Sequence, residues 1–158
     1  MFLSVLIGLG MCYGANLVLT TTYTVLDIMP ENYNQEAVDS LLGGYPLVMT
    51  LCTVVLAPLT EECLFRGVLF APLARRCLPA AYALSIFMFA GMHVFRFLGS
   101  MSAANTILCL SLYLPASFSL CWVYHKTGNI WAGIFLHMFI NFQSVIASLL
   151  RSLLQAFL

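Results

Sequence analysis

Charged residues are scarce in this sequence of 158 amino acids. Asp, Glu, Lys and Arg make up 8% of the chain, whereas hydrophobic residues make up 62% and the mean hydropathy is +0.98. A soluble domain carries roughly 25% charged residues, so this chain has too few to hydrate the surface of a globule of its size. The composition excludes a soluble globular domain and predicts a membrane protein.

The sequence also lacks an excess of charge of either sign, because six Lys and Arg residues balance six Asp and Glu residues. The chain has no basic surplus that would indicate nucleic acid as a partner, and it has no acidic tail that would indicate a solvated disordered segment. Residues 1–26 contain no charge and no basic n-region, so they predict a retained spanning helix rather than a removable signal peptide. The expected partner is the lipid bilayer.

Paired cysteines are missing as well. The six cysteines lie scattered through apolar stretches without any CxxC pair. Free cysteine packs well in apolar interiors, so this pattern favours small buried hydrophobic residues over disulfides or metal ligands. The residues concerned are Cys12, Cys52, Cys63, Cys77, Cys109 and Cys121.

Long uncharged runs dominate the rest of the chain. A spanning helix needs about 20 predominantly apolar residues. By this criterion the sequence predicts spans over residues 1–26, 46–74, 77–95, 97–124 and 127–150. The fold class is therefore an all-α polytopic bundle in a single membrane domain, 1–158, with five spanning helices, or six if Pro115 breaks the fourth run. Residues 27–39 are polar and predict a loop or a short surface helix.

Two further features of these runs concern packing and orientation. Gly10 and Gly14 have the small-xxx-small spacing that lets another helix approach closely. The loop 27–39 has no Lys or Arg. With five spanning helices, Arg96 and Arg151 lie on the same side of the membrane as this loop. Three basic residues lie on the opposite side, namely Arg75, Arg76 and Lys126. The positive-inside rule then predicts a cytoplasmic N-terminus.

Three charged residues fall inside a predicted span. Glu61, Glu62 and Arg66 would each cost roughly 2.5–3.5 kcal/mol at the bilayer centre, on the order of 9 kcal/mol together. Glu62 and Arg66 are four residues apart and share a helix face, while Glu61 is rotated from Glu62 by about 100°. The spacing predicts that Arg66 neutralises Glu62 and that Glu61 faces a polar cavity.

The other polar residues within spans are His93, His137 and Asn141. The four-residue spacing of His137 and Asn141 places two hydrogen-bond donors on one face, as an oxyanion site requires. Each residue also has a structural interpretation, in which a histidine bonds a backbone carbonyl, an asparagine bonds a neighbouring helix, and the Glu–Arg pair serves packing. Their coincidence on three helices favours a site.

In this order the residues resemble the motifs of the CPBP intramembrane proteases, also called the Abi or type II CAAX prenyl endopeptidase-like family. The family motifs EExxxR, FxxxH and HxxxN correspond to residues 61–66 (EECLFR), 89–93 (FAGMH) and 137–141 (HMFIN). The motif-bearing core spans about residues 46–150. The family includes enzymes that trim prenylated CAAX proteins and bacterial proteins linked to bacteriocin processing or self-immunity. Its members often have more spanning helices, which would here precede residue 1.

The resemblance implies a polar cavity in which Glu61 and His93 bind and activate a water, with Glu61 as the general base. It implies that His137 and Asn141 hold the oxyanion of the tetrahedral intermediate. The remaining two motif residues, Glu62 and Arg66, would shape the site. The motif wording is typical of bacteria, so we expect the bacterial cytoplasmic membrane and a membrane-associated or lipid-anchored peptide or protein substrate.

Three alternatives stay open at this stage. The first is a zinc-dependent variant with Glu61, His93 and His137 as ligands and one open position, although there is no HExxH motif and no cofactor is expected. The second is a non-catalytic bacteriocin-immunity or peptide-binding protein on the same scaffold. The third, a transporter or proton pathway, is least favoured because its polar groups would be spread across the bilayer.

Overall fold

A computed structural model describes residues 1–157, and this part of the chain contains helices and connecting segments but no strand. Five helical runs are long and apolar enough to cross a membrane: Phe2–Val25, Pro46–Ala74, Leu78–Phe97, Ala103–Thr127 and Ile130–Gln155. The prediction of five spanning helices in an all-α bundle is confirmed. The six-helix alternative is wrong, because Pro115 lies inside one continuous helix.

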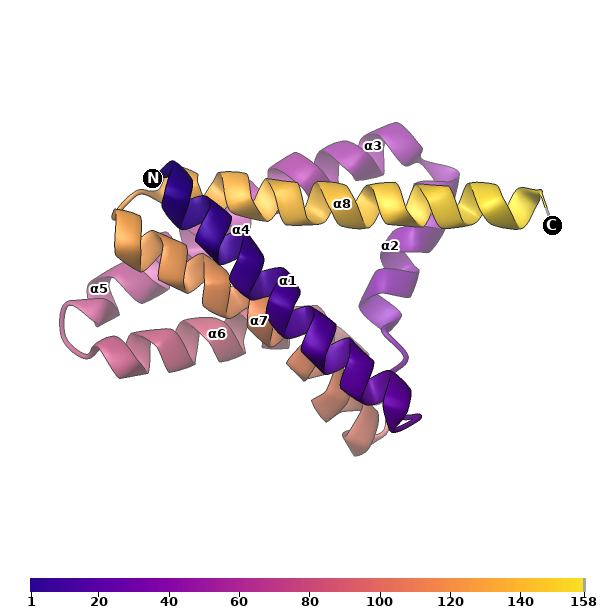
Figure 1. Ribbon diagram of the computed structural model, residues 1–158, viewed down its shortest axis with the longest axis horizontal. Coiled ribbons are helices and arrows are strands. Elements are labelled where there is room, and N and C mark those ends of the chain that lie inside the picture. Colours follow the sequence, from indigo (N-terminus) through magenta and orange to yellow (C-terminus); the bar gives the residue numbers. More distant parts are fainter. Residues whose placement is uncertain (158) are drawn as a thin grey trace.

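The elements follow one another with short connections. They are α1 (Phe2–Val25), α2 (Tyr33–Gly44), α3 (Pro46–Leu51), the π-helical segment η1 (Cys52–Leu56), α4 (Ala57–Glu62), the π-helical segment η2 (Cys63–Phe70), α5 (Ala71–Ala74), α6 (Leu78–Val94), the 3₁₀ turn η3 (Phe95–Phe97), α7 (Ala103–Thr127) and α8 (Ile130–Ala156). In Figure 1, α8 lies along the long axis of the molecule, α1 and α7 run obliquely away from its N-terminal end, and α2 leads up to α3.

The second span is one helical run, as predicted, but two π-helical segments interrupt its α-helical ladder. In the first, the backbone N–H of Ala57 bonds the carbonyl of Cys52, five residues back. Each π segment stands just before a proline, Pro58 or Pro72. A proline has no N–H to donate, and the wider π turn accommodates its ring without ending the helix. The run therefore stays continuous through the predicted site.

The fourth span begins later than the predicted 97–124. Residues 95–97 extend α6 as a 3₁₀ turn, and the Ser102 hydroxyl accepts a bond from the Asn105 N–H at 3.1 Å. This capping bond satisfies a free amide at the helix start and fixes where α7 begins. At its other end, Gly128 adopts φ 61°, a left-handed conformation that glycine adopts without strain. The following turn then leads directly into α8.

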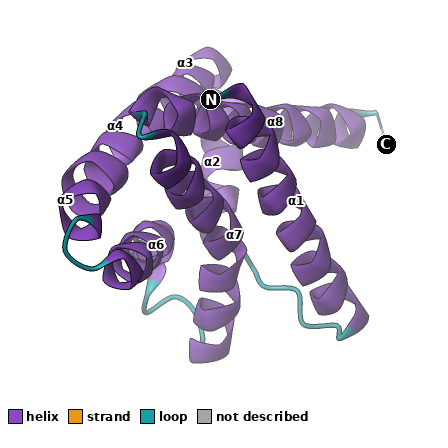
Figure 2. Ribbon diagram, turned by 60° about the vertical axis from the view of Figure 1, so that its left-hand side comes forward, coloured by secondary structure: helices purple, strands orange, loops and turns teal. Residues whose placement is uncertain are grey.

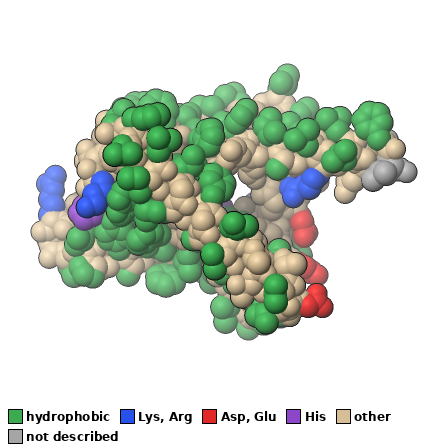
Figure 3. Space-filling model, in the orientation of Figure 1, with side chains coloured by type: hydrophobic (Ala, Val, Ile, Leu, Met, Phe, Trp, Pro, Cys, Tyr) green, Lys and Arg blue, Asp and Glu red, His purple; other side chains and the backbone are tan. Residues whose placement is uncertain are grey.

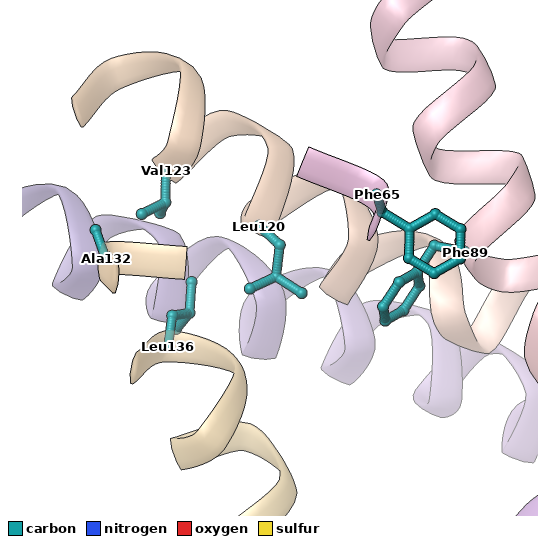
Figure 4. Packing of buried hydrophobic residues seen from close by; sticks show 6 residues of the cluster. All are labelled: Phe65, Phe89, Leu120, Val123, Ala132 and Leu136. Atoms are coloured by element: carbon teal, nitrogen blue, oxygen red, sulfur yellow. The ribbon is translucent and has the colours of Figure 1, made fainter. Parts of the chain in front are cut away.

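The packed centre of the bundle lies between α1, α6, α7, α8 and η2. Figure 4 shows six of its buried apolar residues, which are Phe65, Phe89, Leu120, Val123, Ala132 and Leu136. The close approach of α1 occurs at Gly8, where an added Cβ would collide with Val123 and contact Leu136. Gly10 and Gly14 have nothing within 4 Å of an added Cβ, so the contact expected from their spacing is wrong.

Hydrophobic side chains are spread over the whole visible face in Figure 3, whereas charged ones are few, and lipid would contact these exposed apolar side chains. All six cysteines are free. Cys63 and Cys77 are exposed, so the expectation of burial is wrong for these two. Cys63 lies in a membrane-spanning run, where an apolar thiol can face lipid as well as the protein interior, whereas Cys77 lies in the connection between two runs.

Candidate active site

The four predicted catalytic residues line one cavity of about 360 Å³. Glu61 reaches it from α4, His93 from α6, and His137 and Asn141 from α8. Residues of α1, α2, η1 and α7 complete the lining, and the space-filling view shows the surface hollowed between α1, α8 and α2 (Figure 3). Three motifs far apart in the sequence therefore meet at one place in the membrane domain.

Glu62 and Arg66 lie behind this cavity and are fully buried. An Arg66 nitrogen, Nη1, lies 3.1 Å from Glu62 Oε1, which is the ion pair that the four-residue spacing predicts. The other terminal nitrogen, Nη2, donates to the Ser117 carbonyl at 3.1 Å, and the guanidinium lies 4.7 Å from the centroid of the Phe89 ring. These contacts offset the cost of placing two charges in an apolar interior.

Glu62 has a second partner that the sequence did not reveal. The imidazole Nδ1 of His137 lies 3.0 Å from Glu62 Oε1. Because a carboxylate only accepts, Nδ1 carries the proton, and Nε2 of the neutral ring keeps a lone pair. Gly133, one turn before His137 on α8, leaves room for this contact, since a Cβ there would lie 3.1 Å from Glu62 Oε2. Glu62 thus orients His137 as well as pairing with Arg66.

His93 is oriented by its own helix. Its Nδ1 lies 2.9 Å from the carbonyl oxygen of Phe89, four residues back, and therefore donates its proton there. The Nε2 atom of the neutral ring again keeps a lone pair. The His93 ring lies 4.8 Å from the Phe89 ring and 4.5 Å from the Tyr113 ring, between centroids. The FxxxH spacing thus supplies both the carbonyl and one of the two aromatic neighbours.

The two imidazoles converge on Glu61. Its Oε2 atom lies 3.8 Å from His137 Nε2 and 4.0 Å from His93 Nε2. The same oxygen is buried and has no hydrogen-bond partner, and the side chain is 15% exposed. An acceptor left unpaired in an apolar interior costs free energy unless a donor reaches it. Two imidazole acceptor atoms therefore face an unpaired carboxylate oxygen, and a small hydrogen-bond donor between them would satisfy that oxygen.

Asn141 lies one turn beyond His137 and lines the same cavity. Its Nδ2 donates to the Thr53 carbonyl of η1 at 2.9 Å, so one of its two amide protons is engaged. The sequence placed His137 and Asn141 on one helix face, but it did not show that each of them forms a hydrogen bond to another element. The carbonyl of Thr53 lies in the π segment, where the wider turn gives carbonyls new directions.

Zinc does not fit this arrangement as it stands. Among residues 1–157, no group of three or more His, Cys, Asp or Glu side chains has the geometry to hold a metal ion. Tetrahedral zinc with bonds of roughly 2.0–2.2 Å brings its ligand atoms to about 3.4 Å from one another. The separations of 3.8 and 4.0 Å around Glu61 Oε2 are wider than this.

The sequence analysis missed the polar residues that other elements contribute to the cavity. Tyr113 from α7 and Thr53 from η1 line it, and so do Asn34 and Gln35 from α2 and Asn16 from α1. A polar residue within an apolar run is the only local signal for Asn16, Thr53 and Tyr113. That signal does not tell which helices face one another, so it could not place them at the site.

Comparison with known proteins identifies the family of this chain. The family model "Type II CAAX prenyl endopeptidase Rce1-like" matches residues 43–143, which include all three motifs. The protein named "Putative membrane peptidase YdiL" from Bacillus subtilis (strain 168) is 30% identical over 127 residues, covering 80% of this chain and 48% of that protein. This chain thus spans about half the length of that curated relative, and no solved structure matches it. The chain, an integral multi-pass membrane protein, therefore belongs to the type II CAAX prenyl endopeptidase Rce1-like family.

Proposed function

We propose that this protein is an intramembrane endopeptidase in which Glu61 activates water. The observation behind the proposal is the convergence of His93 Nε2 and His137 Nε2 on the unpaired Oε2 of Glu61, within a cavity of the membrane domain. The family to which the chain belongs is named for endopeptidase activity, which supports a protease as the general class.

In the proposed reaction a water molecule binds between Glu61 Oε2 and His93 Nε2, which accept its two hydrogen bonds, and His137 Nε2 is left for the oxyanion. Glu61 removes one proton, and the water oxygen bonds to the carbon of the scissile peptide carbonyl, whose π electrons move to its oxygen. An electron pair of the oxyanion then re-forms the C=O bond as the C–N bond breaks, the C–N pair stays on nitrogen, and Glu61 returns the proton to that nitrogen. The products are a carboxylic acid and an amine, and Glu61 is restored as a general base.

Stabilisation of the oxyanion falls to Asn141 and His137. Nδ2 of Asn141 has two protons and donates one to Thr53, so one is left for the cavity. His137 Nε2 donates only when the ring is protonated, because Nδ1–H already bonds Glu62. The role that we assign to the Glu62 carboxylate is to stabilise that imidazolium, and Arg66 holds the carboxylate in place.

The position of the cavity supports the proposed substrate class. It is formed by helices that span the membrane, and its lining combines the polar residues above with apolar residues such as Val38, Leu112 and Ile140. A peptide that is embedded in the bilayer or anchored to it by lipid reaches such a site without leaving the membrane. We assign the protein to the bacterial cytoplasmic membrane. The relative from Bacillus subtilis, a bacterium, is named as a membrane peptidase, which supports this assignment.

The test compares the wild-type protein with Glu61→Gln in lipid nanodiscs. Both are incubated with a panel of membrane-inserted and lipidated peptides, and the products are read by mass spectrometry. Losing a general base should lower cleavage about 10²- to 10⁴-fold. Glu36→Gln, on an exposed residue of α2, is the matched control and should cleave like the wild type.

Three results would count against this proposal or one part of it. Equal product from wild type and Glu61→Gln would remove Glu61 as the base. Loss of cleavage on chelation, restored by added zinc, would replace the metal-free mechanism. Binding of a peptide without cleavage by either protein across the panel would favour a sequestering, immunity-type function instead.

A further inference from the structure

Tyr113 contacts His93 directly and lies outside the three sequence motifs. It is a half-buried residue of α7 that lines the cavity. Its ring stacks on the His93 ring with centroids 4.5 Å apart and planes 24° apart. Phe89 contacts the same imidazole from α6, so His93 packs against one ring of its own helix and one of α7. Two aromatic neighbours restrict rotation of the imidazole and keep Nε2 directed at Glu61.

The hydroxyl of Tyr113 reaches a different element. It donates to Asn32 Oδ1 at 3.0 Å and accepts from Asn34 Nδ2 at 3.2 Å. Asn32 is the N-cap of α2, and its Oδ1 also accepts from the backbone N–H of Gln35 at 3.1 Å. A single carboxamide oxygen therefore caps α2 and bonds the tyrosine that packs on His93.

Hydrogen bonds, rather than a buried apolar face, hold α2 at the edge of the cavity. Leu42 is its only buried residue. Gln35 bonds Ser144 and Ser148 of α8, both at 3.3 Å, and the segment before α2 bonds α7 where it crosses that helix (Figure 2). An element with so few buried apolar contacts opens at low free-energy cost compared with the packed core.

From these contacts we infer that Tyr113 is a positioning residue for His93 and that it couples the orientation of His93 to the docking of α2. While α2 is docked, Asn32 and Asn34 hold the Tyr113 hydroxyl, and the phenol ring holds the imidazole. When α2 leaves to admit a peptide, Tyr113 loses both partners, and His93 becomes fully ordered only when α2 closes again. The inference rests on the proposed function for its catalytic consequence, but not for the coupling itself.

The sequence contains only three histidines, which makes the coupling measurable without any substrate. ¹⁵N NMR of histidine-labelled protein reports the tautomer of each ring, and His93→Ala and His125→Ala variants assign the signals. Tyr113→Leu removes the stacked ring, so the His93 signals should move from a single Nδ1–H form towards a tautomer average, with His125 and His137 unchanged. Tyr113→Phe keeps the ring but loses both bonds to α2, so the His93 signals should move in the same direction by a smaller amount.

Tyr82 provides a matched control, because it is a second tyrosine that pairs with a histidine. Its hydroxyl lies 3.0 Å from His125 Nδ1, and the two rings pack at 5.8 Å, away from the cavity. Tyr82→Leu should alter His125 alone. Unchanged His93 signals in Tyr113→Leu would overturn the inference. Equal changes of all three histidines would also overturn it, because they would show a general loss of structure.

Amide exchange tests the link to α2. Loss of the bond from Tyr113 to Asn32 in Tyr113→Phe should raise exchange of the first α2 amides about fivefold, the effect of one net hydrogen bond. Tyr82→Phe should leave those amides unchanged. Unchanged α2 exchange in Tyr113→Phe would refute the coupling, whatever the His93 signals show.

Kinetics on a cleaved peptide complete the test. We expect Tyr113→Leu to lower kcat about 10- to 100-fold through a misplaced imidazole, and Tyr113→Phe, which loses only the bonds to α2, to lower kcat about fivefold. A displaced His93 signal with wild-type kcat would remove the catalytic role of Tyr113. If the wild type cleaves no peptide, the proposed function fails, while the NMR and exchange results still decide whether Tyr113 couples His93 to α2.

Discussion

The ion pair between Arg66 and Glu62 makes the sharpest stability prediction for this protein. Arg66→Leu shortens the side chain to an apolar group and leaves the Glu62 carboxylate buried without its cation. Both side chains have 0% exposure, so no water replaces the lost partner. Removing one partner of a buried pair costs roughly 3–5 kcal/mol, and the two bonds from Arg66 to Ser117 are lost as well. We expect the free energy of unfolding to fall by about 3–5 kcal/mol.

The assay is SDS-induced unfolding in mixed micelles, followed by circular dichroism. The double variant Arg66→Leu/Glu62→Gln separates the charge effect from lost packing. Removing the second charge should restore the free energy of unfolding to within about 2 kcal/mol of wild type, since a buried pair contributes little net stability over neutral residues. Arg76→Leu, at an exposed helix end, should change stability by less than about 0.5 kcal/mol. The reasoning is refuted if Arg66→Leu alone stays within about 1 kcal/mol of wild type, or if the double variant is less stable than the single one.

Three further predictions concern α8 and the orientation in the membrane. Gly133→Ala should place a methyl group 3.1 Å from Glu62 Oε2 and destabilise the protein by about 1–3 kcal/mol in the same unfolding assay, whereas Gly10→Ala, with open space around it, should not. Asn141→Ala should lower kcat about 10- to 10³-fold by removing an oxyanion donor, and wild-type kcat would exclude that role. A variant with Cys77 as its single cysteine should react with a membrane-impermeant maleimide in inside-out vesicles and not in intact cells, because Cys77 is exposed beside the basic residues that predict the cytoplasmic side. Labelling in intact cells only would reverse the orientation.

Local patterns predicted part of the site as well as the spans. Glu62 and Arg66 are one helical turn apart, so helix geometry alone brings them together, and the structure contains that pair. The bond from His93 to the Phe89 carbonyl is local in the same sense. Patterns of this range fail where a contact depends on the neighbouring helix, as at Gly10, whose spacing suggested a close approach that α1 makes at Gly8 instead.

The sequence by itself determined that the chain crosses a membrane, that it does so about five times, and which few polar residues lie within those crossings. The tertiary structure alone decided what these residues contact. Glu62 bonds His137 across 75 residues, and Asn141 bonds Thr53 across 88. The physical reason is that hydropathy and helical period describe residues close together in the sequence, within one helix. Which faces of two helices meet depends instead on packing among all of them, and that packing directs His93 and His137 at the same oxygen of Glu61.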